Sequence, residues 1–382
     1  MGDADLVFGW RTALLLTLSV QLAVLAAALV VQPMNRAANR ILAAFLIVVV
    51  GVMTPYTIGF AGFYDAWMWL TFAPFALPLF LAPLLYGYTH RLVRGRLPER
   101  WLVHLAPGGA QLTYLAGAFL LPLDAKMTWG GRVDGPWIGP AVAAGVALGL
   151  VAYAVLGLRL LRHYRRRLAD ERSDDDRFAA RWLARVLAAM ALTTTVWIVW
   201  QVWGLATPGP NYFGFFWLHL SFGVIGLYLG VEGWRHAALA FASLEHADAP
   251  PTIETDWAAI GADVLSRTRA EAWWREPDLS LPDLARRLGT NTGRLSRAIN
   301  LGLGMNFSTC INGLRAEGVA EALSGGSGAD LLDLAFQMGF ASKASFNRAF
   351  RARYGMAPSA WRRGVSKHDY SALDPELRRV AP

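Results

Sequence analysis

The chain has 382 residues, of which 55% are hydrophobic, 12% aromatic and only 17% charged. Together with the positive mean hydropathy of +0.33, this composition excludes an ordinary soluble protein and indicates that much of the chain lies in a membrane. The formal net charge of +8 favours anionic partners, such as nucleic acid or the anionic lipid of an inner leaflet.

Most of the hydrophobic excess lies in the first 235 residues, where long apolar runs alternate with short charged breaks. A helix of about 20 apolar residues is long enough to cross a bilayer. We predict seven spans, at residues 11–31, 41–60, 67–88, 101–121, 137–158, 182–205 and 213–231. The third span contains Pro74, Pro78 and Pro83, so a kink is expected there.

The basic residues of the breaks predict the orientation of the spans. The first, third and fifth breaks contain 14 arginines, whereas the N-terminal segment and the other breaks contain only Arg11, Lys126 and Arg132. By the positive-inside rule, the arginine-rich breaks face the cytoplasm. An odd number of spans then places the N-terminus outside and the chain after residue 235 in the cytoplasm. The residues before the first span are acidic rather than basic, so we expect an uncleaved helix there instead of a signal peptide.

Polar and ionisable residues inside membrane spans often mark function, and they are scarce here. Trp197, Trp200 and Trp203 recur every three residues in the sixth span, with Gln201 beside them and His219 in the seventh. One hypothesis is an aromatic pocket that binds an apolar or cationic ligand. The other is an interfacial belt with ordinary helix packing, which is the commoner use of tryptophan in membrane proteins. The spans contain no lysine, so a retinal Schiff base is excluded.

Residues 236–262 are predicted to be a linker, because the Pro250–Pro251 pair stops any helix that continues from the last span. We expect this linker to carry any signal from the membrane to the C-terminal region. The sequence contains no phosphate-cradling glycine loop, no metal-ligand spacing and no paired carboxylates, so no enzymatic activity and no cofactor are predicted. The single cysteine, Cys310, allows no intramolecular disulfide and is consistent with a reducing compartment.

The C-terminal region contains two helix-turn-helix patterns. In the first, a helix at residues 281–288 is followed by a turn at Gly289 and a second helix at residues 291–301. In the second, a helix that begins at Leu331 ends at Gly339, and a new helix follows with Ser342 as its cap.

The second pattern resembles the DNA-binding domain of the AraC/XylS family of bacterial transcription regulators. The residues that carry this resemblance are Ala335, Gly339, Phe340, Ser342, Phe346, Arg348, Ala349, Phe350, Gly355, Pro358, Trp361 and Arg362. In the first pattern they are Leu295, Arg297, Ile299, Gly304 and Phe307. The resemblance covers residues 263–363 and implies two helix-turn-helix units joined by a long helix. It also implies double-stranded DNA and RNA polymerase as partners.

The second helix of each unit is then expected to enter the major groove of DNA. Polar side chains on these helices suit base edges and phosphates. The candidates for DNA contact are Arg294, Ser296, Arg297, Lys343, Ser345, Asn347 and Arg348. Gly293 stands where many family members have a larger reading residue, so the first unit is expected to read fewer bases than the second.

Together these patterns predict an all-α protein. It would comprise a seven-helix transmembrane domain at residues 1–235, the linker, an AraC-type DNA-binding domain at 263–366 and a C-terminal tail at 367–382. The predicted function is transcription regulation from the inner membrane of a bacterium, as a homodimer whose membrane domain senses an unidentified ligand or partner. Two alternatives stay open. In the first, the membrane part is an anchor that senses no ligand. In the second, the chain is a transporter or membrane enzyme with a fused DNA-binding tail.

Overall fold

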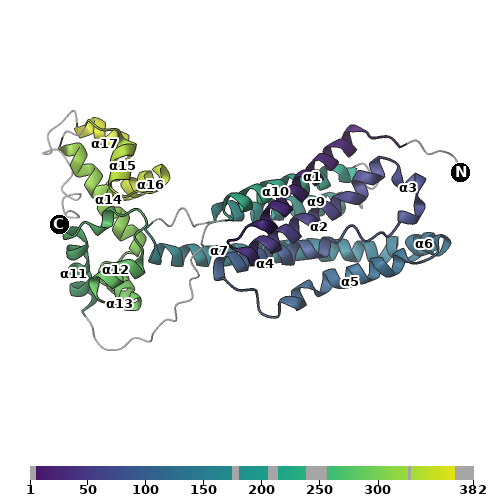
Figure 1. Ribbon diagram of the computed structural model, residues 1–382, viewed down its shortest axis with the longest axis horizontal. Coiled ribbons are helices and arrows are strands. Elements are labelled where there is room, and N and C mark those ends of the chain that lie inside the picture. Colours follow the sequence, from purple (N-terminus) through teal and green to yellow (C-terminus); the bar gives the residue numbers. More distant parts are fainter. Residues whose placement is uncertain (1–5, 174–179, 205–213, 238–255, 326–327, 366–382) are drawn as a thin grey trace. The chain divides into compact units, whose positions relative to one another are not determined.

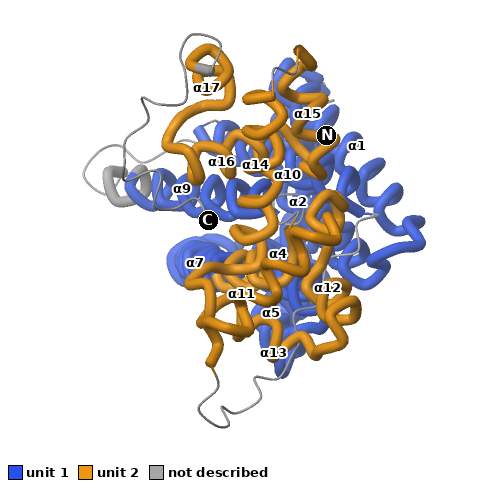
Figure 2. Tube along the Cα trace, turned by 90° about the vertical axis from the view of Figure 1, so that its left-hand side faces the viewer, with its two compact units in different colours: residues 1–162, 180–245 blue, residues 163–179, 246–382 orange. Residues whose placement is uncertain are grey.

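The computed structural model describes residues 6–173, 180–204, 214–237, 256–325 and 328–365 (Figure 1). Within these ranges the regular structure is helical, apart from an isolated antiparallel bridge between Arg172 and Ser280. The all-α prediction is therefore confirmed for the described residues. The chain forms two compact units, which Figure 2 distinguishes by colour. The N-terminal unit comprises residues 1–162 and 180–245, and the C-terminal unit comprises residues 163–179 and 246–382.

The N-terminal unit contains long helices and several short ones. They are α1 (Trp10–Val31), α2 (Arg36–Phe60), α3 (Phe63–Ala66), η1 (Met68–Leu70), η2 (Pro78–Phe80), α4 (Leu81–Arg94), α5 (Trp101–Phe119), α6 (Leu123–Trp129), η3 (Gly130–Ile138), α7 (Gly139–Glu171), α9 (Arg181–Gly204) and α10 (Phe215–Arg235). Helix α7 carries residues of both units, because the boundary between them falls after Arg162.

Five of the helices, not seven, are long and apolar enough to cross a membrane. Among the described residues they are Trp10–Val31, Arg36–Phe60, Leu123–Glu171, Arg181–Val199 and Phe215–Arg235. The first, second, fifth, sixth and seventh predicted spans thus have a counterpart. The third and fourth do not, and their prediction was wrong.

The third predicted span is not a single helix. Pro74 and Pro78 interrupt it, so that 3₁₀ turns and irregular backbone precede α4, and Pro83 lies in the first turn of α4. Helix α4 has 14 residues. At 1.5 Å per residue this gives a length of about 21 Å, which is short of the roughly 30 Å of a bilayer core.

The fourth predicted span is a helix, α5, of 19 residues. It is less apolar than the five long helices, because it contains Pro107 and the polar side chains of His104 and Gln111. The Gln111 side chain accepts a hydrogen bond from Leu79 N at 3.3 Å and donates one to Ala76 O at 3.5 Å. Helix α5 therefore satisfies open backbone groups of the irregular stretch before α4.

Helix α10 packs closely against α1 and α2 through one face of glycines (Figure 1). These glycines are Gly223, Gly226, Gly230 and Gly233. A Cβ added at Gly230 would lie 3.0 Å from Leu25 Cδ1 on α1 and 3.1 Å from Leu46 Cδ1 on α2. Small residues at such a face let helix backbones approach closely, which is how apolar helices associate where burial from water gives no driving force.

The C-terminal unit contains the end of α7 and nine further helical segments in its described residues. They are α11 (Trp257–Ala270), η5 (Trp273–Arg275), α12 (Leu281–Leu288), α13 (Thr292–Arg297), η6 (Ala298–Gly302), α14 (Phe307–Ser324), α15 (Leu331–Gln337), α16 (Lys343–Tyr354) and α17 (Pro358–Val365). The two helix-turn-helix units are α12–α13 and α15–α16, and α14 joins them, as the sequence predicts.

Helix α14 contributes to two hydrophobic cores. Its first half, with Phe307 and Ile311, packs against α11, α12 and α13. Its second half, with Val319 and Leu323, packs against α15, α16 and α17. Trp257 also packs against the first core, although the sequence analysis assigned it to the linker. The rest of the predicted linker between residues 238 and 255, and the tail after residue 365, lie outside the described residues.

Candidate nucleic-acid interface

Capping residues define the ends of the helices in the first helix-turn-helix unit. Ser280 caps α12, and Gly289 ends it with a φ of +68°, a conformation that glycine adopts without strain. The side chain of Asn291 then accepts a hydrogen bond of 2.8 Å from Arg294 N and so begins α13. Helix α13 has six residues and continues as the π-helical turn η6, which leaves Arg294 exposed on the short helix.

The other two candidates on α13 have partners inside the unit. The guanidinium of Arg297 lies 5.3 Å from the ring centroid of Trp257, and its Nε donates to Gly293 O at 3.3 Å. The hydroxyl of Ser296 accepts a hydrogen bond of 3.2 Å from Asn300. Both side chains are half-buried, so Arg294 is the most accessible of the three predicted contacts.

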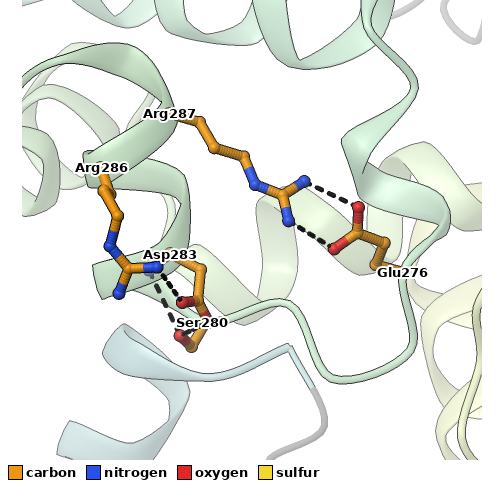
Figure 3. A network of polar contacts seen from close by, with 5 residues as sticks. All are labelled: Glu276, Ser280, Asp283, Arg286 and Arg287. Atoms are coloured by element: carbon orange, nitrogen blue, oxygen red, sulfur yellow. Dashed lines mark hydrogen bonds and ion pairs between the residues drawn. The ribbon is translucent and has the colours of Figure 1, made fainter.

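A set of ion pairs fixes α12 from outside its core (Figure 3). Arg287 binds Glu276 with two hydrogen bonds of 2.7 Å, and Arg286 lies 3.3 Å from Asp283. The hydroxyl of Ser280 contacts the carboxylate of Asp283 in the same turn. The bonds from Arg287 hold the pKa of Glu276 below its ordinary value.

The second unit has a longer reading helix, and its turn packs against the backbone of η5. Gly339 has a φ of +88°, and a Cβ there would overlap the carbonyl of Arg275. Ser342 accepts a hydrogen bond of 3.1 Å from Ser345 N, which begins the 12-residue α16. Phe350 is fully buried and anchors the helix in the second core.

The structure separates the four candidates on α16 into accessible and buried positions. Lys343 and Arg348 are exposed, and Asn347 is half-buried. Ser345 is the least accessible of the four, because its side chain is only 5% exposed and its hydroxyl donates to Ser342 O at 2.9 Å. This bond completes the first turn of the helix.

A cleft of about 680 Å³ lies between α11, α14 and α16. Arg269, Arg348 and Arg353 line it, together with the carboxylate of Glu317. Glu317 binds Arg269 at 2.6 Å and Arg353 at 2.7 Å, which holds these two guanidinium groups in place. The cleft therefore has an excess of positive charge next to the reading helix, as a phosphate-binding surface requires.

Residues 284–364 match a family model described as a helix-turn-helix domain. The C-terminal region carries an AraC-type helix-turn-helix domain. This match extends from α12 to α17 and so includes both units and the helix that joins them. No curated protein matches the chain, and no solved structure does.

The predicted ligand residues of the N-terminal unit are only partly described. His219 on α10 is buried, its Nδ1 lies 2.7 Å from Phe215 O, and its ring stacks on Tyr56 of α2 with a centroid distance of 3.7 Å. This is the arrangement of a packed, hydrogen-bonded histidine. Trp197 is half-buried. The side chains of Trp200, Gln201 and Trp203 lie outside the described residues.

Proposed function

We propose that this protein is a membrane-embedded bacterial transcription regulator. The observation that carries the proposal is an AraC-type helix-turn-helix domain in the same chain as five long apolar helices. The domain supplies sequence-specific DNA binding, and the helices supply attachment to the inner membrane.

The loop charges and the number of spans support a cytoplasmic C-terminal unit. The two predicted spans that the structure does not support are neighbours in the chain, so their removal leaves an odd number of crossings. The ends of the chain would still lie on opposite sides, with the ten arginines of the first and fifth breaks in the cytoplasm and the four arginines of the third break outside. The arginine-rich segment at the end of α7 favours the cytoplasmic side for the C-terminal unit.

DNA would be read by α13 and α16 in successive major grooves, about 34 Å or one helical turn apart. On α16 we assign base contacts to Lys343, Asn347 and Arg348, since arginine and lysine recognise guanine and asparagine recognises adenine. On α13 we assign contacts to Arg294 first, then to Arg297 and Ser296.

Regulation would need a membrane signal with different affinity for two states of the protein. We propose a homodimer, in which tethering raises the effective concentration of the second DNA-binding domain, with RNA polymerase as the downstream partner. The tryptophan face of Trp197, Trp200 and Trp203 with Gln201 is the proposed ligand contact. His219 fits packing better, given its contact with Tyr56.

Genome-wide occupancy of the full-length protein in its host would test this function. We expect a small set of discrete promoter peaks for the wild type. These peaks should disappear for Arg348→Ala and persist for Arg267→Ala, which removes the same charge from an exposed position on α11. A protein that is abundant in the membrane but gives no discrete peaks would contradict the proposal.

A second experiment separates a sensor from an anchor. Residues 163–179 of the C-terminal unit interrupt the N-terminal unit, so a chimera that replaces the membrane helices keeps these residues in a cytoplasmic loop of an unrelated anchor that has the same orientation. Unchanged regulation by this chimera would favour the anchor. Loss of the response, with DNA occupancy retained, would favour a sensor.

A further inference from the structure

The chain that follows α7 is part of the C-terminal unit. Helix α7 ends at Glu171, and Arg172 then forms an antiparallel bridge with Ser280. Ser173 continues this pairing: its backbone N donates to Leu279 O at 3.4 Å, and its hydroxyl donates to the same oxygen at 2.8 Å. Ser280 is the residue that caps α12. The end of α7 is therefore paired with the residues that begin the first helix-turn-helix unit.

Ser173 also joins a buried polar network on the connecting helix α14. Arg315 is 0% exposed, and its Nη2 donates to Ser173 Oγ at 3.1 Å. The other donors of this guanidinium reach Trp274 O at 2.7 Å, Asn312 Oδ1 at 3.0 Å and the carbonyl of Glu276. A buried guanidinium needs such a complete set of acceptors, because an unpaired charge away from water is strongly unfavourable.

Asn312 closes the network from the other side. Its Nδ2 donates to Ser173 O at 2.9 Å and to Ser308 Oγ at 3.1 Å. Ser173 itself is only 1% exposed. Its backbone N–H, backbone carbonyl and hydroxyl are thus all bonded to the first helix-turn-helix unit or to α14. A surface loop that rested loosely on the domain would not bury all three groups.

We propose that Arg172 and Ser173 form a docking segment through which α7 holds the first helix-turn-helix unit and transmits the state of the membrane domain to it. The inference rests on the proposed function and names the route of its regulation. Helix α7 is continuous over 33 residues and lies within a candidate membrane span. A change at its membrane end would move the docking segment, and the network would pass this movement to α12 and α14.

This route differs from the one that the sequence predicts. The linker after α10 is the direct covalent path to the DNA-binding domain, and it was expected to carry the signal alone. The docking segment adds a second attachment, which reaches the domain through side-chain and backbone bonds with Leu279, Asn312 and Arg315.

A cysteine pair in the full-length protein tests the docking. Residues that face each other across an antiparallel bridge have Cβ atoms about 4.5 to 5.5 Å apart, so Arg172→Cys with Ser280→Cys should form a disulfide. The native Cys310 can stay, because burial raises the pKa of its thiol to about 12 and leaves it unreactive. The matched control is Arg172→Cys with Ser359→Cys, which places the second thiol at an exposed position on α17.

We expect the first pair, in oxidised native membranes, to give an intrachain disulfide and a faster-migrating band, and the control pair to give none. No disulfide, or a disulfide between two chains, would overturn the proposal. If the intrachain disulfide forms normally but the protein gives no promoter peaks, the proposed function is contradicted and the docking contact is still supported.

Transmission can be tested because coupling between docking and DNA binding must act equally in both directions. If the docking segment couples to DNA binding, operator DNA must shift the disulfide equilibrium by the same factor by which docking shifts DNA affinity. In a glutathione buffer, we expect operator DNA to change the equilibrium constant for the disulfide about fivefold or more, and a scrambled duplex to leave it unchanged. An operator that binds and leaves this constant unchanged would show that the segment is structural only.

Discussion

In the first helix-turn-helix unit the reading helix α13 has six residues, whereas α16 in the second unit has 12. Helix α13 runs directly into η6, which packs against α11, and a Cβ at Gly302 would overlap the backbone of Trp257. Helix α16 ends at Gly355, whose φ is +70°. The first reading helix is therefore clamped by a neighbouring helix, while the second ends in an ordinary glycine cap.

The two units also differ in what stabilises them. The second unit has an aromatic core, in which Phe350 contacts Phe346 and Trp361 at centroid distances of 5.8 and 5.9 Å. The first unit adds the buried network of Arg315 and the docking segment to a core that is mostly aliphatic, with Trp274 and Phe307 as its buried aromatic residues. Hydrophobic packing is non-directional, whereas a network of hydrogen bonds fixes the position of each residue in it. We therefore propose different roles for the two units. The second unit mainly reads DNA, and the first is mainly held in a fixed position by its hydrogen-bonded network.

The largest expected effect comes from breaking the network of the first unit. Arg315→Ala removes a fully buried guanidinium and leaves its acceptors without donors. We expect a loss of about 3 to 5 kcal/mol in the unfolding free energy of the first unit. Amide hydrogen exchange of α12 and α14 in the full-length protein would measure it.

The counterpart in the second unit is Phe350→Ala, which empties a fully buried site of the aromatic core and should also cost about 3 to 5 kcal/mol. If the units are stabilised separately, exchange should accelerate in α16 for this variant and in α12 for Arg315→Ala. If hydrogen exchange accelerates equally in α12 and α16 for both variants, the two units unfold as one cooperative unit. They would then not be stabilised separately.

DNA affinity provides the next test, with an effect of intermediate size. Arg348→Ala should weaken specific binding by about 1 to 3 kcal/mol, or roughly 5- to 150-fold, and leave non-specific binding nearly intact. Arg294→Ala should have a smaller effect, because α13 is short and carries Gly293 in its exposed first turn. Titration of the full-length protein with operator and scrambled duplexes would measure both. A larger loss of specific DNA affinity for Arg294→Ala than for Arg348→Ala would mean that the first unit, and not the second, is the main reader of the sequence.

The sequence predicts the C-terminal unit closely because its signals are local. The first helix at Leu281–Leu288, the turn at Gly289 and the connecting helix from Phe307 all follow from caps, glycines and apolar periodicity over a few residues. The burial of Ser345 was not anticipated, although a local signal for it exists. Ser345 lies three residues after the capping Ser342, a spacing typical of side chains that bond back to the cap.

Two features could not be predicted in this way. The count of seven spans came from the length of apolar runs, which does not reveal that prolines break the third run into short turns. The bond between Ser173 and Arg315 joins residues 142 positions apart. Periodicity and capping rules reach only a few residues along the chain, so a contact of this separation leaves no pattern in a single sequence.

The smallest expected effect concerns the ion pair on the surface of the first unit. Glu276→Gln removes the partner of Arg287 near α12, and because both side chains are partly exposed we expect a loss of at most about 1 kcal/mol at neutral pH. Since the pKa of Glu276 is lowered in the folded state, this contribution is present above the pKa of the unfolded chain. It disappears as the pH falls through the folded pKa. Hydrogen exchange of α12 in wild type and variant should therefore differ at pH 7 and converge in acid.

High salt offers the matching control for this pair, because exposed charges are screened within about 3 Å at 1 M ionic strength. We expect 1 M salt to remove the difference between wild type and Glu276→Gln in α12. Exchange in α16 should not respond to the substitution at either salt concentration, because the ion pair on this helix joins Arg353 to Glu317 and does not include Glu276. A response in α16 would mean that the ion pair of Glu276 with Arg287 also stabilises the second unit, and that the two units are coupled.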